Sequence, residues 1–192
     1  MPRVACITAL LVAALAASVI ALLGPPHPSA DDAFKWLRPS APMPGWTPLV
    51  TPTGAELARA PWFNDIAGDA YTASAAIGPA PRYVAYLNIT PQQGMESLAA
   101  FPMARLEHLH DEDTSVREIA AITRRPFGDA TVSCVEDTYR TRIGATAYRE
   151  IACLIDRGSQ RSGDVFVAAA LANAWHRYAP NLERSIASAQ IR

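Results

Sequence analysis

The sequence predicts an α+β fold: an antiparallel β-sheet with helices packed on it, preceded by one N-terminal transmembrane or signal helix. Three observations support this prediction. Three strand-like stretches follow one another at 130–141, 146–156 and 165–172. A stretch with helical spacing of apolar residues lies between strand-like stretches at 82–89 and 115–123. The run 4–23 near the amino terminus contains no charged residue.

The apolar run 4–23 has the length of a membrane span, because twenty helical residues extend about 30 Å, the thickness of the bilayer core. Arg3 precedes the run and Asp31 and Asp32 follow it, as the positive-inside rule expects for a cytoplasmic amino terminus. The run 4–23 has three interpretations: an uncleaved membrane anchor, a signal peptide cleaved after Ala30, or a buried core helix. The first two predict a single-pass cell-membrane protein with its carboxy-terminal domain outside the cytoplasm, or a secreted protein.

Residues 24–53 are rich in proline, which blocks helix interiors and sheet ladders, so we expect an extended linker there. Trp36 and Trp46 do not suit a free tether. We expect Trp46 to pack on the domain, and Trp36 to do so too or to lie at the bilayer interface. The domain organisation is therefore a membrane or signal segment at 1–23, a linker at 24–53 and an extracytoplasmic α+β domain at 54–192.

Within the domain, 54–63 suggests a short helix and 67–77 a first strand, followed by the alternating strand 82–89. The motif Thr90-Pro91-Gln92-Gln93 has the features of a helix start. A kink is expected at Pro102. The residues that would share one face of this helix are Met95, Leu98, Leu106 and Leu109.

After this helix, 115–123 is β-branched and reads as a strand, and 124–129, with a proline and a glycine, reads as a turn. The three strands of the meander follow. Pro180 then opens a short final helix with Leu182 and Ile186 on one face.

The two cysteines of the meander fit a hairpin that reverses at Ile143-Gly144. That register places Cys134 opposite Cys153. In an exported domain, two opposed cysteines predict a disulfide, and buried free thiols or a redox pair are the alternatives. The same register predicts three further pairs: Val132 with Ile155, Glu136 with Ile151, and Tyr139 with Tyr148.

The charged residues of this hairpin are expected to form exposed cross-strand pairs. They are Asp137, Glu150, Arg140, Arg142 and Arg149. The formal charge of the chain is −1 and no basic cluster is present, so we expect no nucleic-acid partner.

One cluster has residue types that bind divalent metals: His108, His110, Asp111 and Asp113. His108 and His110 diverge on a helix because they are two residues apart, and a solvated acidic helix end is the simpler interpretation. No nucleophile elbow, phosphate-binding glycine loop or dinucleotide fingerprint occurs in the sequence. We therefore expect no catalytic residue and no cofactor, and the four residues remain weak metal candidates.

Three stretches resemble small exported actinobacterial proteins of unknown function: YLNITPQQGMESLAAFPMARLEH, SCVEDTYRTRIGATAYREIACLI and FVAAALANAWHRYAPNLERSIAS. The order of elements over 82–190 also resembles PsbP-like domains, including mycobacterial LpqN-type lipoproteins. A lipobox cysteine is absent here, because Cys6 lacks the residues that would precede it. The resemblance implies an accessory or binding module and transfers no catalytic residue.

These observations favour a non-catalytic, membrane-anchored or secreted binding domain, with the membrane (through 4–23) and another envelope protein as expected partners. The alternatives are an envelope metal-dependent protein or hydrolase that uses His108, His110 and Asp111, and a structural subunit of a membrane complex.

Overall fold

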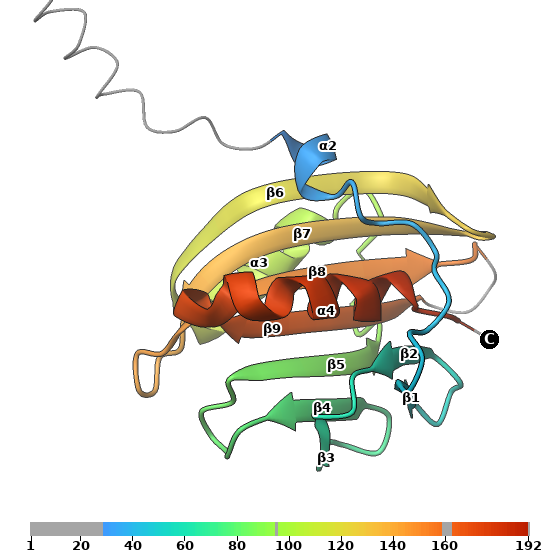
Figure 1. The fold of residues 1–192 in the computed structure, drawn as a ribbon. Helices are drawn as coiled ribbons and strands as arrows, with labels where there is room; N and C mark the ends of the chain where they lie inside the picture. Colours follow the sequence, from blue (N-terminus) through green and yellow to red (C-terminus); the bar gives the residue numbers. More distant parts are fainter. Residues whose placement is uncertain (1–28, 95, 159–162, 192) are drawn as a thin grey trace, which may run out of the picture.

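The computed structural model describes residues 29–94, 96–158 and 163–191, so the predicted membrane or signal segment lies outside the described residues. A central sheet of seven antiparallel strands has the order β3-β4-β5-β9-β8-β7-β6 (Figure 1). Its strands are β3 (Asn64–Ile66), β4 (Ala73–Ile77), β5 (Ala85–Pro91), β6 (Thr114–Phe127), β7 (Ala130–Arg140), β8 (Ala147–Asp156) and β9 (Asp164–Leu171). In the part of the chain that is described, no helix combines the length and apolar character needed to cross a bilayer.

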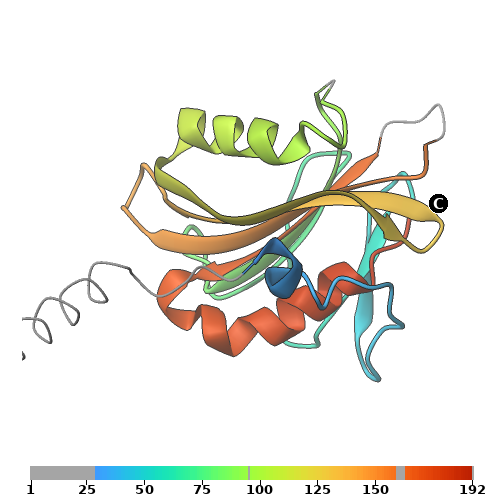
Figure 2. The same cartoon turned by 90° about the horizontal axis from the view of Figure 1, so that it is seen from above.

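Two helices cover opposite faces of this sheet (Figure 2). Helix α3 (Phe101–Glu112) lies on one face, and α4 (Trp175–Ala187), which follows the 3-10 turn η1 (Ala172–Ala174), lies on the other. A small sheet of β1 (Thr47–Val50) and β2 (Glu56–Arg59) adjoins the end of α4, where the Ser188 hydroxyl accepts a hydrogen bond from the Ala58 amide. The α+β class with an antiparallel sheet and packed helices is confirmed.

The larger hydrophobic core lies on the α4 face, because alternate residues of each strand point toward that helix. Helix α4 contributes an apolar stripe with helical spacing. Its members Trp175, Ala179, Leu182 and Ile186 are all buried. The strands contribute residues such as Leu87, Phe166 and Ile151, each no more than 1% exposed.

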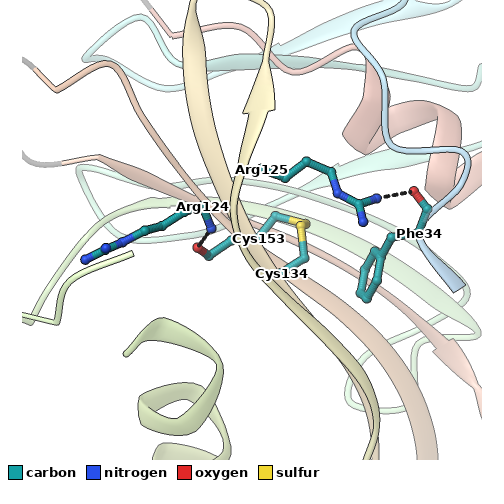
Figure 3. The surroundings of a disulfide bond; sticks show 6 residues. Phe34, Arg124, Arg125, Cys134 and Cys153 are labelled. Atoms are coloured by element: carbon teal, nitrogen blue, oxygen red, sulfur yellow. Dashed lines mark hydrogen bonds between the residues drawn. A yellow bond between two sulfur atoms is a disulfide. The ribbon is translucent and has the colours of Figure 1, made fainter. Parts of the chain in front are cut away.

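The predicted hairpin register is confirmed in every pair: Cys134 with Cys153, Val132 with Ile155, Glu136 with Ile151, and Tyr139 with Tyr148. Cys134 and Cys153 form a disulfide with their Cα atoms 4.1 Å apart (Figure 3). Both cysteines are fully buried in the core under α4. The reversal occupies residues 141–146, where Gly144 has a φ of 83° that glycine tolerates best.

Residues 29–53, the described part of the predicted linker, pack on the domain and do not extend from it as a stalk. Helix α2 (Ala30–Ala33) is followed by Phe34, which is 1% exposed and lies beside the disulfide (Figure 3). The carbonyl of Phe34 accepts a hydrogen bond of 3.3 Å from Arg125 of β6, which also pairs with Asp31. Trp36 and Trp46 are partly buried against the same core, as predicted for Trp46.

Several predicted elements differ from the structure. The stretch 54–63 contains strand β2 and no helix, because its backbone pairs with β1 and with Gln190. Thr90 and Pro91 end strand β5 and do not start a helix. Helix α3 starts at Phe101 with Pro102 in its first turn, where a missing N–H costs nothing, so no kink results. Met95 lies outside the described residues.

Two further boundaries shift. Strand β6 continues through 124–127, so the turn that was predicted over 124–129 begins only at Gly128. Helix α4 begins at Trp175, and Pro180 lies inside it and does not open it.

Because Phe34 is a buried part of the core, Phe34→Ala is expected to lower the free energy of unfolding by about 3 kcal/mol, through lost burial and the cavity left behind. Urea unfolding measures this effect. The neighbouring Lys35→Ala, which alters an exposed side chain, is the control and should change stability by less than about 0.5 kcal/mol. Equal effects of the two changes would show that 29–53 is not part of the folded unit.

Candidate functional site

A pocket of about 430 Å³ lies between α3 and the sheet, at the ends of strands β5 and β9. Its apolar wall consists of Phe101, Val165 and Val167. Tyr86 of β5 and Arg105 of α3 supply polar atoms, and His108 also lines the pocket. Polar residues of the loops and of β5 also line it: Asp69, Thr72, Asn88, Thr90, Gln93 and Glu96. The pocket thus combines an apolar wall with many polar groups.

Behind this wall, Arg105 forms an ion pair with Glu150, a carboxylate on β8 that is fully buried. The Arg105 Nε and Nη2 atoms donate to Glu150 Oε1 at 2.9 and 2.5 Å. Tyr86 donates its hydroxyl to the other oxygen, Oε2, at 2.9 Å. A buried charge needs such partners, and here they come from a helix and from a strand that is not adjacent.

The register across the sheet explains how Tyr86 reaches Glu150. Tyr86 of β5 is opposite Ala169 of β9, and Ala169 is opposite Glu150 of β8. The three side chains therefore lie in one row on the α3 face, and the small methyl group of Ala169 leaves room for the phenol to pass over it. The Tyr139 hydroxyl, 2.8 Å from that of Tyr86, extends the network.

The next residue in the same row is Asp137 of β7, which is directly opposite Glu150. Asp137 is also fully buried, and neither of its carboxyl oxygens has a hydrogen-bond partner among the described residues. Burial and, next, the nearby Glu150 carboxylate raise the pKa of Asp137 to about 8, although Arg105 opposes the shift. Asp137 is therefore largely protonated at neutral pH.

Arg105 and Tyr86 keep their ordinary protonation states. Burial opposes the charge of Arg105, but the charge and hydrogen bonds of Glu150, together with Tyr86 and Asp137, outweigh it and raise the pKa of Arg105. Burial, followed by the same carboxylate, raises the pKa of Tyr86 well above its usual value. Arg105 is thus a cation and Tyr86 a phenol, so at neutral pH the cluster of Arg105, Glu150 and Asp137 is close to neutral.

Helix α3 positions Arg105 because its inward residues are spaced four apart: Phe101, Arg105 and Leu109. Phe101 packs on Val135 and Ala152, and Leu109 packs on Tyr139 and Tyr148. Arg105 is the charged member of an otherwise apolar stripe. The apolar contacts on both sides hold its guanidinium over Glu150.

A second buried ion pair lies on the opposite, α4 face. Glu136 is 5% exposed and accepts a hydrogen bond of 2.8 Å from Arg149 Nε. Arg149 stacks 5.0 Å from the ring centroid of Trp175. Burial and, second, Glu136 raise the pKa of Glu183 on α4 to about 7.

The predicted metal cluster does not come together. His108 lines the pocket with its Nε2 atom 3.5 Å from Glu112, whereas His110 is exposed. The Asp111 carbonyl accepts a hydrogen bond from the Arg142 side chain, and the Asp113 carboxylate accepts one from the Arg142 amide. Within the described ranges, no three His, Cys, Asp or Glu side chains are grouped as metal ligands.

The expectation that Asp137 and Glu150 form exposed charge pairs is wrong, because both are fully buried beneath α3. Arg140 and Arg142 are exposed, as expected, and Arg149 is partly buried. The predicted register already indicated that these two carboxylates are not an ordinary exposed pair. It placed Asp137 opposite Glu150, and two like charges directly opposed are unfavourable on an exposed ladder.

Comparison with known proteins identifies the fold only. No protein-family model and no curated protein matches the chain. The solved structure of PA94, a Pseudomonas aeruginosa protein of unknown function, has a TM-score of 0.52 and 10% identity, and the match covers 77% of this chain and 97% of that one. LpqN, involved in cell envelope biogenesis of Mycobacterium tuberculosis, matches with a TM-score of 0.48 and 15% identity over 76% and 90% of the two chains. The Saccharomyces cerevisiae Ran-binding protein Mog1p has a TM-score of 0.47 and 13% identity, over 74% and 86%.

The raised pKa of Asp137 gives the fold a distinctive pH dependence. Between the ordinary pKa of 3.8 and about 8 the unfolded chain loses the proton and the folded chain keeps it, so stability falls as pH rises. Asp137→Asn removes this titration and should make the decline shallower by up to about 1.4 kcal/mol per pH unit.

Urea unfolding at a series of pH values between 4 and 8 measures the slopes. Glu107→Gln, which alters an exposed carboxylate of α3, is the control and should retain the wild-type slope. Glu183, whose pKa is also raised, contributes equally to the pH dependence of stability in all three proteins. Parallel curves for wild type and Asp137→Asn would show that Asp137 ionises freely in the folded state.

Proposed function

We propose that this chain is a non-catalytic accessory domain that acts outside the cytoplasm, tethered by 4–23 or secreted, and that it binds a small molecule in the pocket beneath α3. The observation that carries the binding role is the pocket itself. The pocket is concave and has a mixed apolar and polar lining, and Glu150 holds two of its polar residues, Tyr86 and Arg105, in place.

The rigidity of that wall supports binding. The Arg105 guanidinium is held by two hydrogen bonds to Glu150, and the Tyr86 hydroxyl is held by a third. Groups that are fixed before a ligand arrives lose little conformational entropy on binding. Such a pocket can orient a ligand without any change in the sheet.

The Cys134–Cys153 disulfide supports a location outside the cytoplasm, because structural disulfides persist in oxidising compartments. The predicted membrane or signal segment 4–23 points the same way. The resemblance of 82–190 to PsbP-like and LpqN-type domains also favours this role, since domains of that kind mostly act as accessory or binding modules.

A substitution that fills the pocket tests this proposal. Ala104 lines the pocket on α3, so Ala104→Trp should occupy it, whereas its neighbour Met103 is 62% exposed and Met103→Trp should leave it open. Native mass spectrometry of the full chain purified from its own cells is expected to find a small-molecule adduct. The adduct should be lost in Ala104→Trp and retained in Met103→Trp.

The intact mass of the same samples also reports whether the cysteine pair is oxidised. An adduct that survives Ala104→Trp would place binding elsewhere, and the absence of any adduct would remove the binding role. Reduced cysteines in the freshly isolated protein would contradict a location outside the cytoplasm.

A further inference from the structure

Negative charge dominates the surroundings of the pocket. Among the described lining residues, Asp69 and Glu96 carry carboxylates, Arg105 carries the permanent positive charge, and His108 is the remaining basic group. The charge of Arg105 is already matched by Glu150 behind it. An arginine in a pocket usually suggests an anionic ligand, but here its countercharge is built into the fold.

Arg105 nevertheless has hydrogen-bonding capacity left for a ligand. A guanidinium has five N–H donors, and the hydrogen bonds to Glu150 use Nε and Nη2 only. The hydrogen bonds to Glu150 do not use Arg105 Nη1, and the Arg105 side chain is 18% exposed and lines the pocket. A carbonyl or hydroxyl oxygen can accept from these N–H groups without bringing a charge.

We infer that the pocket selects an uncharged molecule, with an apolar body and a carbonyl or hydroxyl group that accepts from Arg105, and that Glu150 excludes carboxylate and phosphate ligands. This inference rests on the proposed function and adds the class of ligand. The apolar body lies against Phe101, Val165 and Val167.

The physical basis is the distance of the ligand from Glu150. A ligand atom bound to Arg105 lies just across the guanidinium from that carboxylate, at a depth where water screens charge poorly. Glu150 cancels much of the attraction that Arg105 would offer to an anion, and the anion must also lose its hydration, whereas a neutral acceptor loses far less. Asp69 and Glu96 at the lining add repulsion of the same sign.

Two probes with the same ring system separate these cases: 2-naphthamide, which is neutral, and 2-naphthoate, which is an anion at pH 7. Binding to the full-length chain in lipid nanodiscs is followed by the methyl resonances of Val165 and Val167, with empty nanodiscs as the control for partitioning. We expect the amide to shift these resonances with a dissociation constant at least about tenfold lower than that of the carboxylate.

Glu150→Gln provides the decisive comparison, because the amide is close in shape to the carboxylate and removes its charge, although it replaces one of the two acceptor oxygens by a donor. In this variant the carboxylate probe should gain affinity until the two dissociation constants agree within about threefold. Glu183→Gln, which alters a half-buried carboxyl group of α4 on the other face of the sheet, is the matched control and should keep the wild-type ratio.

The outcomes are distinct. If naphthoate binds wild type as tightly as naphthamide, or if Glu150→Gln leaves the ratio unchanged, the inferred ligand class is wrong while the pocket remains a binding site. If neither probe shifts the Val165 and Val167 methyls at millimolar concentration, both this inference and the use of the pocket for small molecules are overturned.

A second variant covers the case in which Glu150→Gln fails to fold. The double change Asp69→Asn with Glu96→Gln removes two carboxylates of the pocket lining that lie outside the buried network. This double variant should lower the ratio of the dissociation constant of 2-naphthoate to that of 2-naphthamide at least about threefold. An unchanged preference in that folded variant would also overturn the inference.

Discussion

The ion pair between Arg105 and Glu150 is the interaction on which the α3 side of this protein depends. Glu150 lies in the middle of a seven-stranded sheet with no exposed surface, so its charge must be compensated from within the fold. The compensation comes from α3 through Arg105 and from β5 through Tyr86. One carboxylate thereby fixes the helix, the strand and the pocket between them.

The two faces of the sheet are stabilised by different means. Under α4 a large apolar core is cross-linked by the Cys134–Cys153 disulfide, with Phe34 from the amino-terminal segment packed beside it (Figure 3), and the Glu136–Arg149 ion pair lies on the same face. Under α3 the apolar clusters are smaller and surround a charged centre. Breaking a buried ion pair costs several kcal/mol, whereas replacing the whole pair by apolar groups is often neutral. This charged centre therefore suggests a role in specificity rather than in stability.

The sequence predicted the features that depend on local alternation and missed those that depend on distant packing. The hairpin register followed from side-chain parity and from the two cysteines, and the four predicted pairs that lie within the strands were confirmed. The burial of Asp137 and Glu150 was missed because carboxylates are usually exposed and because α3, which covers them, is distant in sequence. The stretch Glu56–Arg59 became a strand by pairing with the neighbouring Thr47–Val50 in a short hairpin and with Gln190, which is distant in sequence.

A double-mutant cycle on the Arg105–Glu150 pair tests the central claim most directly. Arg105→Met leaves Glu150 buried without its main partner and should lower the free energy of unfolding at pH 7 by about 3–5 kcal/mol. Adding Glu150→Gln removes the stranded charge, so the double variant is expected to be more stable than Arg105→Met alone. A double variant less stable than Arg105→Met, with the two losses adding, would contradict a buried pair whose members depend on each other.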